Sequence, residues 1–86
     1  MDQQFEFPRR MADRDATEEQ VIETPRLGEP IPAHSGRVGC ARVFEYGREH
    51  EGTVYPEIRV IVFAAPQVDR TVIVTVTTQF GQWSSS

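Results

Sequence analysis

The sequence predicts a small α+β domain in which two short N-terminal helices pack on a three- to four-stranded antiparallel sheet. The first observation is the length of 86 residues, which suffices for one domain and is too short for two. The second is an N-terminal third with helix-start signals. The third is a C-terminal half rich in β-branched residues. We therefore expect a single domain over residues 1–86, with residues 1–6 and 84–86 frayed.

The two helices are expected before residue 25. Pro8 suits the first turn of a helix, where its missing N–H has no cost, and a short helix over residues 9–14 follows it. Thr17 and Gln20 form the Thr-x-x-Gln pattern of a capping box, which predicts a second helix over residues 18–24. Pro25 is expected to end this helix, because the residue before a proline disfavours the α region.

Alternating apolar and polar residues predict strands in the second half of the chain. The three predicted strands span residues 37–46, 57–64 and 72–77. A polar turn at residues 47–52 and a hairpin connection at residues 65–69 join them. Residues 25–36 contain three prolines and two glycines, which predicts a loop with a short edge segment at residues 29–33.

The apolar run at residues 60–65 indicates a middle strand that is covered on both faces. The helices can cover one face. Two arrangements can cover the other: Phe80 and Trp83 folding back beyond the last strand, or a second copy of the chain.

Composition excludes several functional classes. The net charge of −4 is concentrated in residues 1–36, which hold eight acidic residues and four arginines, and this argues against a generally basic nucleic-acid-binding surface. The sequence has no phosphate-binding glycine loop, nucleophile elbow, paired-cysteine zinc motif or HExxH motif. We therefore expect no nucleotide cofactor, no other cofactor and no bound metal. No apolar run is long enough for a membrane helix, and the single Cys40, expected to be buried and inert, suits the cytoplasm.

The candidate catalytic residues are the two histidines, His34 and His50. Both lie in predicted loops and could carry a proton near neutral pH. The alternative is that each is a solvated loop residue. Glu49 and Glu51 flank His50, but the spacing does not match a metal-binding motif.

The candidate binding residues are arginines and tyrosines on the predicted strands. Arg42 and Arg59 each interrupt an apolar stretch, and on neighbouring strands they could share a surface with Tyr46 or Tyr55. Such a surface would bind anions or phosphate groups. The alternative is an edge arginine that pairs with a glutamate of its own strand.

Residues 10–21, which read Arg-Met-x-x-Arg followed by Thr-x-x-x-Val, resemble the opening of a bacterial domain family of unknown function near the RelE- and BrnT-like toxins. The resemblance implies two short helices and an antiparallel sheet ending in a Val-Thr-Val segment, here at Val74–Thr77. It also implies that Arg10 and Arg14 face the sheet and contact RNA. The leading histidine of that family falls at Glu6, which implies a non-catalytic relative.

Two functional hypotheses follow, beside the alternative of a subunit or oligomeric piece with no independent activity. The first is a cytosolic protein-binding or regulatory module, derived from a phage or mobile element, that binds a protein partner or a second copy through its acidic helical surface and an exposed sheet face. The second is a RelE/BrnT-like ribonuclease toxin or its degenerate relative, in which the arginines contact RNA and a histidine carries the proton. The absence of catalytic motifs favours the first hypothesis and a non-enzymatic role.

Overall fold

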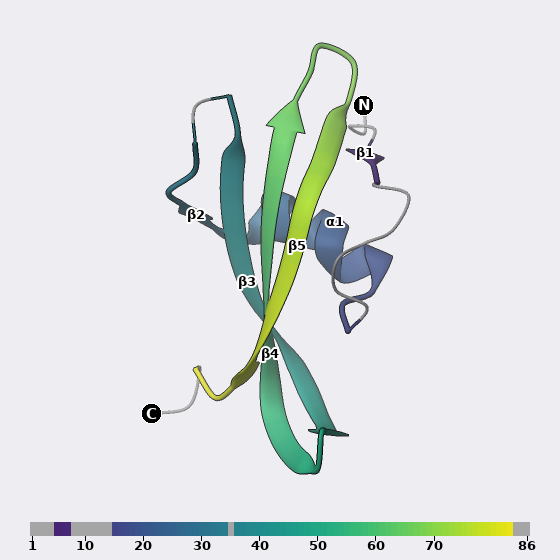
Figure 1. Cartoon of the computed structure of the whole chain (residues 1–86), viewed down its shortest axis with the longest axis vertical. Helices are drawn as coiled ribbons and strands as arrows, with labels where there is room; N and C mark the ends of the chain where they lie inside the picture. The colour runs from purple at the N-terminus through teal and green to yellow at the C-terminus, as the bar shows by residue number, and fades with distance from the viewer. Residues whose placement is uncertain (1–4, 8–14, 35, 84–86) are drawn as a thin grey trace.

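The structure of the protein, a computed structural model, describes residues 5–7, 15–34 and 36–83. These residues form one helix and a five-stranded sheet of order β1-β5-β4-β3-β2 (Figure 1). The elements are β1 Phe5–Glu6, α1 Glu18–Leu27, β2 Glu29–Ile31, β3 Val38–His50, β4 Thr53–Pro66 and β5 Thr71–Gly81. β1 is parallel to β5 and the other neighbours are antiparallel.

The expected fold class is therefore wrong in its details, although the domain is α+β. The sheet is mixed and five-stranded because two short segments, β1 and β2, add to the edges of the three predicted strands. The described residues contain one helix rather than two, and the helix predicted over residues 9–14 lies outside them. No helix among the described residues is long and apolar enough to cross a membrane.

The helix α1 begins as the sequence predicts and ends later than expected. The capping box is confirmed, because the Gln20 N–H donates to the Thr17 hydroxyl and the Thr17 N–H donates to the Gln20 side chain, both at 3.1 Å. Pro25 lies inside the helix and does not end it. A proline in the last turn removes only one intrahelical hydrogen bond, and the Gly28 N–H still donates to the Thr24 carbonyl oxygen at 2.8 Å.

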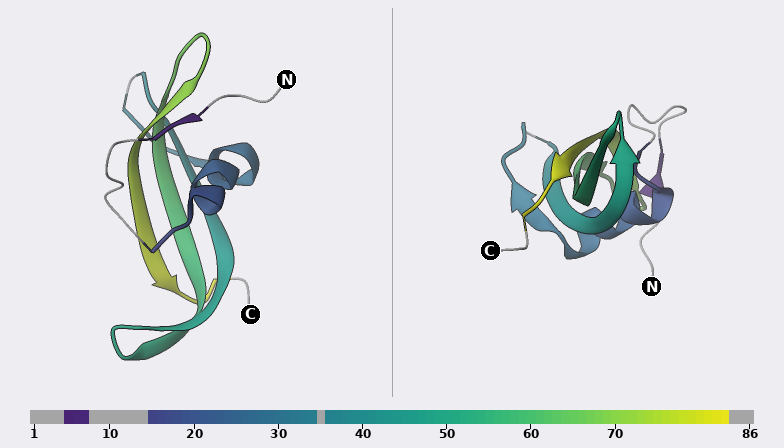
Figure 2. Two further views of the ribbon diagram at one scale, coloured as in Figure 1. Left: turned by 90° about the vertical axis from the view of Figure 1, so that its right-hand side faces the viewer. Right: turned by 90° about the horizontal axis from the view of Figure 1, so that it is seen from below.

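The core lies between α1 and one face of the sheet, and Figure 2 shows α1 on this single side. Directly paired residues of neighbouring strands point to the same face, so the Cys40–Val62 and Val62–Val76 pairs define the helix-facing side. Val21 of α1 is fully buried against it. The opposite side, which we call the open face, has no described helix over it, and its Ile61 and Phe63 are only half-buried.

The hairpin of β3 and β4 is longer than expected. The predicted polar turn at residues 47–52 is wrong, because β3 continues to His50 through a register shift between Glu45 and Arg48. Gly47, with φ of 61°, supplies the left-handed conformation that such a bulge uses. The turn itself contains only Glu51 and Gly52, with φ of 50° and 85°, as a tight hairpin with a right-handed twist requires.

Candidate binding groove at the free edge of β3

β2 covers only a short part of the outer edge of β3. It pairs with Gly39, Cys40 and Ala41, and beyond Ala41 no described residue pairs with this side of β3. The Ala41 carbonyl points toward this edge, because a Cβ atom on Gly28 would lie only 2.5 Å from its oxygen. Alternate residues of a strand direct their N–H and C=O groups to the same edge. The backbone groups of Val43 therefore point outward, past the end of β2.

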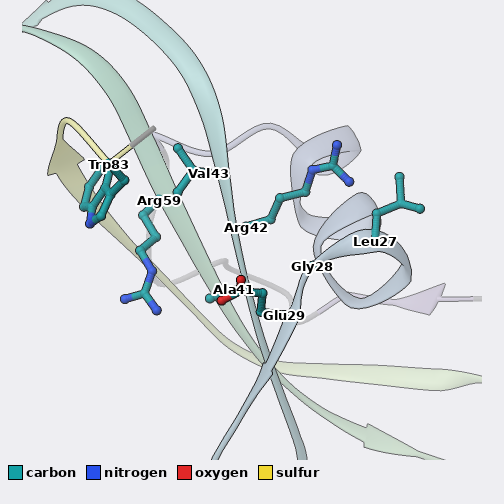
Figure 3. A pocket seen from close by; sticks show the side chains of 8 residues that line it. All are labelled: Leu27, Gly28, Glu29, Ala41, Arg42, Val43, Arg59 and Trp83. Carbon is teal, nitrogen blue, oxygen red and sulfur yellow. The ribbon is translucent and has the colours of Figure 1, made fainter. Parts of the chain in front are cut away.

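A groove of about 590 Å³ surrounds this point (Figure 3). Its floor is β3 together with Arg59 of β4, one wall is the end of α1 with the start of β2, and the other wall is Trp83. The lining residues are Leu27, Gly28, Glu29, Ala41, Arg42, Val43, Arg59 and Trp83. We call this set the β3-edge groove.

The two candidate arginines both line the β3-edge groove, but they lie on opposite faces of the sheet. Arg42 pairs with Val60 and so points to the helix side, whereas Arg59 pairs with Val43 and points to the open face. In Figure 3 their side chains leave the hairpin in opposite directions, Arg42 beside α1 and Arg59 beside Trp83. A ligand strand laid along the edge would therefore have one guanidinium on each side.

Neighbouring side chains hold the guanidinium groups without neutralising them. The Arg42 Cζ atom lies 5.4 Å from the centre of the Phe44 ring, and Arg59 donates to the Gln79 side-chain oxygen at 3.2 Å. Within the part of the chain that the structure describes, neither arginine forms an ion pair. The expected alternative, pairing with a glutamate of the same strand, is not what these residues show.

Trp83 forms the C-terminal wall because a buried carboxylate holds its backbone. Its N–H donates to the Glu57 carboxylate at 2.6 Å, and Glu57 is only 9% exposed. The indole ring lies over Gly81, where a Cβ atom would be 3.3 Å from the ring. The side chain stays 42% exposed, and Leu27 on the opposite wall is 64% exposed. Apolar surface thus lies on both sides of the free strand edge.

The candidate tyrosines and His50 form a separate cluster. The rings of Tyr46, His50 and Tyr55 gather around Phe80, with centroid distances of 5.0, 3.9 and 5.5 Å. Phe80 lies within β5 and pairs with Ile58 on the helix side, so the expectation that it folds back beyond the last strand is wrong. This cluster extends the core along the hairpin, and its two tyrosines do not line the β3-edge groove.

The other histidine lies on the open face. His34 lines a hollow of about 700 Å³ with Arg37, Phe63 and neighbouring residues, and its carbonyl accepts the Arg37 N–H at 3.0 Å. Neither histidine lines the β3-edge groove with Arg42 and Arg59. Arg10 and Arg14 lie outside the described residues.

Metal and thiol chemistry have little support in the described ranges. No group of three or more histidine, cysteine or acidic side chains there is placed to hold a metal ion. Cys40 is a buried free thiol, and burial raises its pKa above the ordinary value for a thiol. A thiol of this kind stays protonated at neutral pH and is a poor nucleophile.

The sequence pattern indicated the two arginines, but it did not indicate Leu27, Val43 or Trp83 as groove residues. Leu27 lies beyond Pro25, where the helix was expected to have ended. Val43 contributes its outward-pointing backbone N–H and C=O, and a pattern of residue types does not show where backbone groups point. Of these three residues, only Trp83 could have been predicted to contribute to a surface, because a large aromatic residue just after a strand needs a surface to contact.

Comparison of the chain with family models, with curated proteins and with solved structures gave no match. The resemblance to the RelE- and BrnT-like toxin families therefore stays a prediction, and so does the ribonuclease hypothesis that follows from it. The fold and the β3-edge groove define a small α+β domain with a peptide-sized groove beside a free strand edge, and the function is argued from that geometry.

Proposed function

We propose that the protein is a non-enzymatic interaction module that binds a segment of a partner protein in the β3-edge groove. The observation that carries the proposal is the free edge of β3 at Val43, with exposed apolar side chains on both walls. An unpaired strand edge is a template for another chain. Leu27 and Trp83 supply the apolar contacts that recognition sites commonly place around such a template.

The composition of the groove supports binding rather than catalysis. Its lining contains no histidine, cysteine, serine, threonine or lysine. Its charged residues are two arginines and Glu29, which is exposed. A nucleophile with an adjacent general base is the usual requirement for covalent catalysis, and this lining does not provide one.

Charge is distributed so that the groove differs from the acidic remainder of the chain. The groove lies at the C-terminal end of α1, while Glu18 and Glu19 lie in the first turn. The rise of 1.5 Å per residue separates these ends by about 14 Å, which exceeds the Debye length of about 8 Å at physiological salt. Glu18 and Glu19 therefore do little to neutralise the groove. The single free thiol suits a reducing compartment, so we place the module in the cytoplasm.

The test uses linear peptides displayed on phage and selected against the immobilised protein. Trp83 is the only tryptophan, so binding of a selected peptide should change the intrinsic fluorescence. We expect Leu27→Ala to weaken binding about fivefold to tenfold through lost apolar contact.

The matched control is Val68→Ala, which truncates a fully exposed apolar side chain outside the groove. This variant should bind like the original protein. Selected peptides that bind both variants with unchanged affinity, or that leave the Trp83 emission unchanged, would show that the β3-edge groove is not the binding site.

A further inference from the structure

We infer that the ligand of the β3-edge groove is an extended acidic segment of the partner protein, which adds to the sheet as a strand beside Val43. This inference rests on the proposed function, and it names the chemistry and the conformation of the bound segment. Three features of the groove carry it: the backbone of β3, the position of the two arginines and the charge of the lining.

The backbone of β3 already shows the binding mode within the chain. β2 is a three-residue strand that pairs with this same edge between Gly39 and Ala41. Beyond the end of β2, the same edge of β3 continues to Val43, whose N–H and C=O point outward. An extended peptide can occupy this position with main-chain hydrogen bonds, as in other cases of strand addition to a sheet edge.

The arginines determine which side chains the added strand should carry. Successive residues of a strand point to opposite faces, so neighbouring ligand residues would face Arg42 on the helix side and Arg59 on the open face. Arg42 lies on the adjacent strand, about 5 Å from the ligand backbone, and Arg59 lies one strand further, at about 10 Å. Arginine and carboxylate side chains together span both distances. Charge-assisted, bidentate pairing with carboxylates suits guanidinium groups that have no ion pair.

The apolar and acidic residues of the groove determine which residue types the ligand should carry at its other positions. Trp83 and Leu27 favour an apolar residue on each side of the acidic pair. Glu29 lies at the β2 end of the groove and repels a carboxylate there. The ligand should therefore carry its acidic residues opposite Arg42 and Val43, with apolar residues flanking them.

The peptides selected from the phage library provide the first test. We expect them to be enriched in adjacent acidic residues flanked by apolar ones. Replacing the acidic residues of a selected peptide with asparagine and glutamine should lower its affinity about tenfold or more. Methylating one central backbone nitrogen, which removes a main-chain donor and leaves the side chains unchanged, should lower affinity to a similar degree.

Protein variants provide the second test. Arg42→Ala and Arg59→Ala should each lower affinity for an acidic peptide about tenfold, and higher salt should reduce this difference. Arg37→Ala is the matched control, because it removes the same charge from an exposed position outside the groove. That variant should bind almost as tightly as the original protein.

Failure of this inference is distinguishable from failure of the proposed function. Selected peptides that require Leu27 but carry no acidic residues, or that tolerate backbone methylation, would overturn the acidic-strand inference and keep the interaction module. Peptides that bind without Leu27 would overturn both. Light scattering that shows a dimer, with Leu27→Ala restoring a monomer, would instead make a second copy of the chain the occupant and would also overturn the inference.

Discussion

Gly28 connects α1 to β2 and packs against the edge of β3, and replacing it tests how tightly these elements are packed. A Cβ atom at this position would lie 2.5 Å from both the Ala41 and the Thr24 carbonyl oxygens. Both neighbours are backbone atoms, so neither can rotate away. The φ of Gly28 is −82°, which any residue adopts, so the cost of Gly28→Ala comes from space rather than from backbone strain.

The expected change in the free energy of unfolding of Gly28→Ala is the sum of two opposing contributions. Overpacking costs about 1–3 kcal/mol, and two fixed oxygens place Gly28→Ala near 3 kcal/mol. Alanine also lowers the entropy of the unfolded chain, which offsets about 0.4–1 kcal/mol. We expect a net loss of about 2 kcal/mol, which for a domain of this size lowers Tm by about 8–16 °C.

Thermal unfolding followed by circular dichroism measures this shift, and Gly81→Ala is the control. The added Cβ atom at Gly81 would lie 3.3 Å from the ring of Trp83, a half-exposed side chain that can move by a few tenths of an ångström. Its Tm should change by only a few degrees, about the shift for 0.5 kcal/mol. A Gly28→Ala variant that melts with the original protein, or a Gly81→Ala variant that is equally destabilised, would refute the packing argument.

Three further predictions concern the core, the helix cap and the thiol. Val21→Ala should lower the free energy of unfolding by about 2–3 kcal/mol in urea denaturation, because Val21 is 0% exposed; a loss below about 0.5 kcal/mol would contradict its place in the core. Thr17→Ala should cost about 1 kcal/mol through loss of the capping bond, and unchanged stability with unchanged helical signal would argue against the cap. Burial raises the pKa of Cys40, so the unfolded chain loses the thiol proton first and the free energy of unfolding should fall as pH rises above the ordinary thiol pKa. Urea denaturation of the original protein and Cys40→Ala across alkaline pH measures this, and an equal pH dependence of the two would be the contrary result.

The parts of the fold that follow from local chemistry were predictable. The capping box at Thr17 required only residues three positions apart. The centres of β3, β4 and β5 required only alternation and β-branched residues. The edge strand β2 at Glu29–Ile31 lies within the short edge segment that the prolines predicted at residues 29–33. The edge strand β1 at Phe5–Glu6 was not predictable, because it is too short to show a period and only its pairing with β5 makes it a strand.

The candidate site was also predictable only in part. Sequence pattern identified Arg42 and Arg59 as unusual residues on strands. Their placement on opposite faces depends on the register that aligns Arg42 with Val60, which residue patterns do not contain. The free edge at Val43 was also beyond prediction, because it results from where β2 ends rather than from the side chain of Val43.

Hydrogen–deuterium exchange at the Val43 amide, measured by NMR with and without a selected acidic peptide, tests the central claim most directly. We expect fast exchange in the free protein, because this N–H points away from the sheet, and strong protection when the peptide is bound. An amide that is already protected in the free protein, or that exchanges equally fast in the complex, would contradict the addition of a strand at this edge.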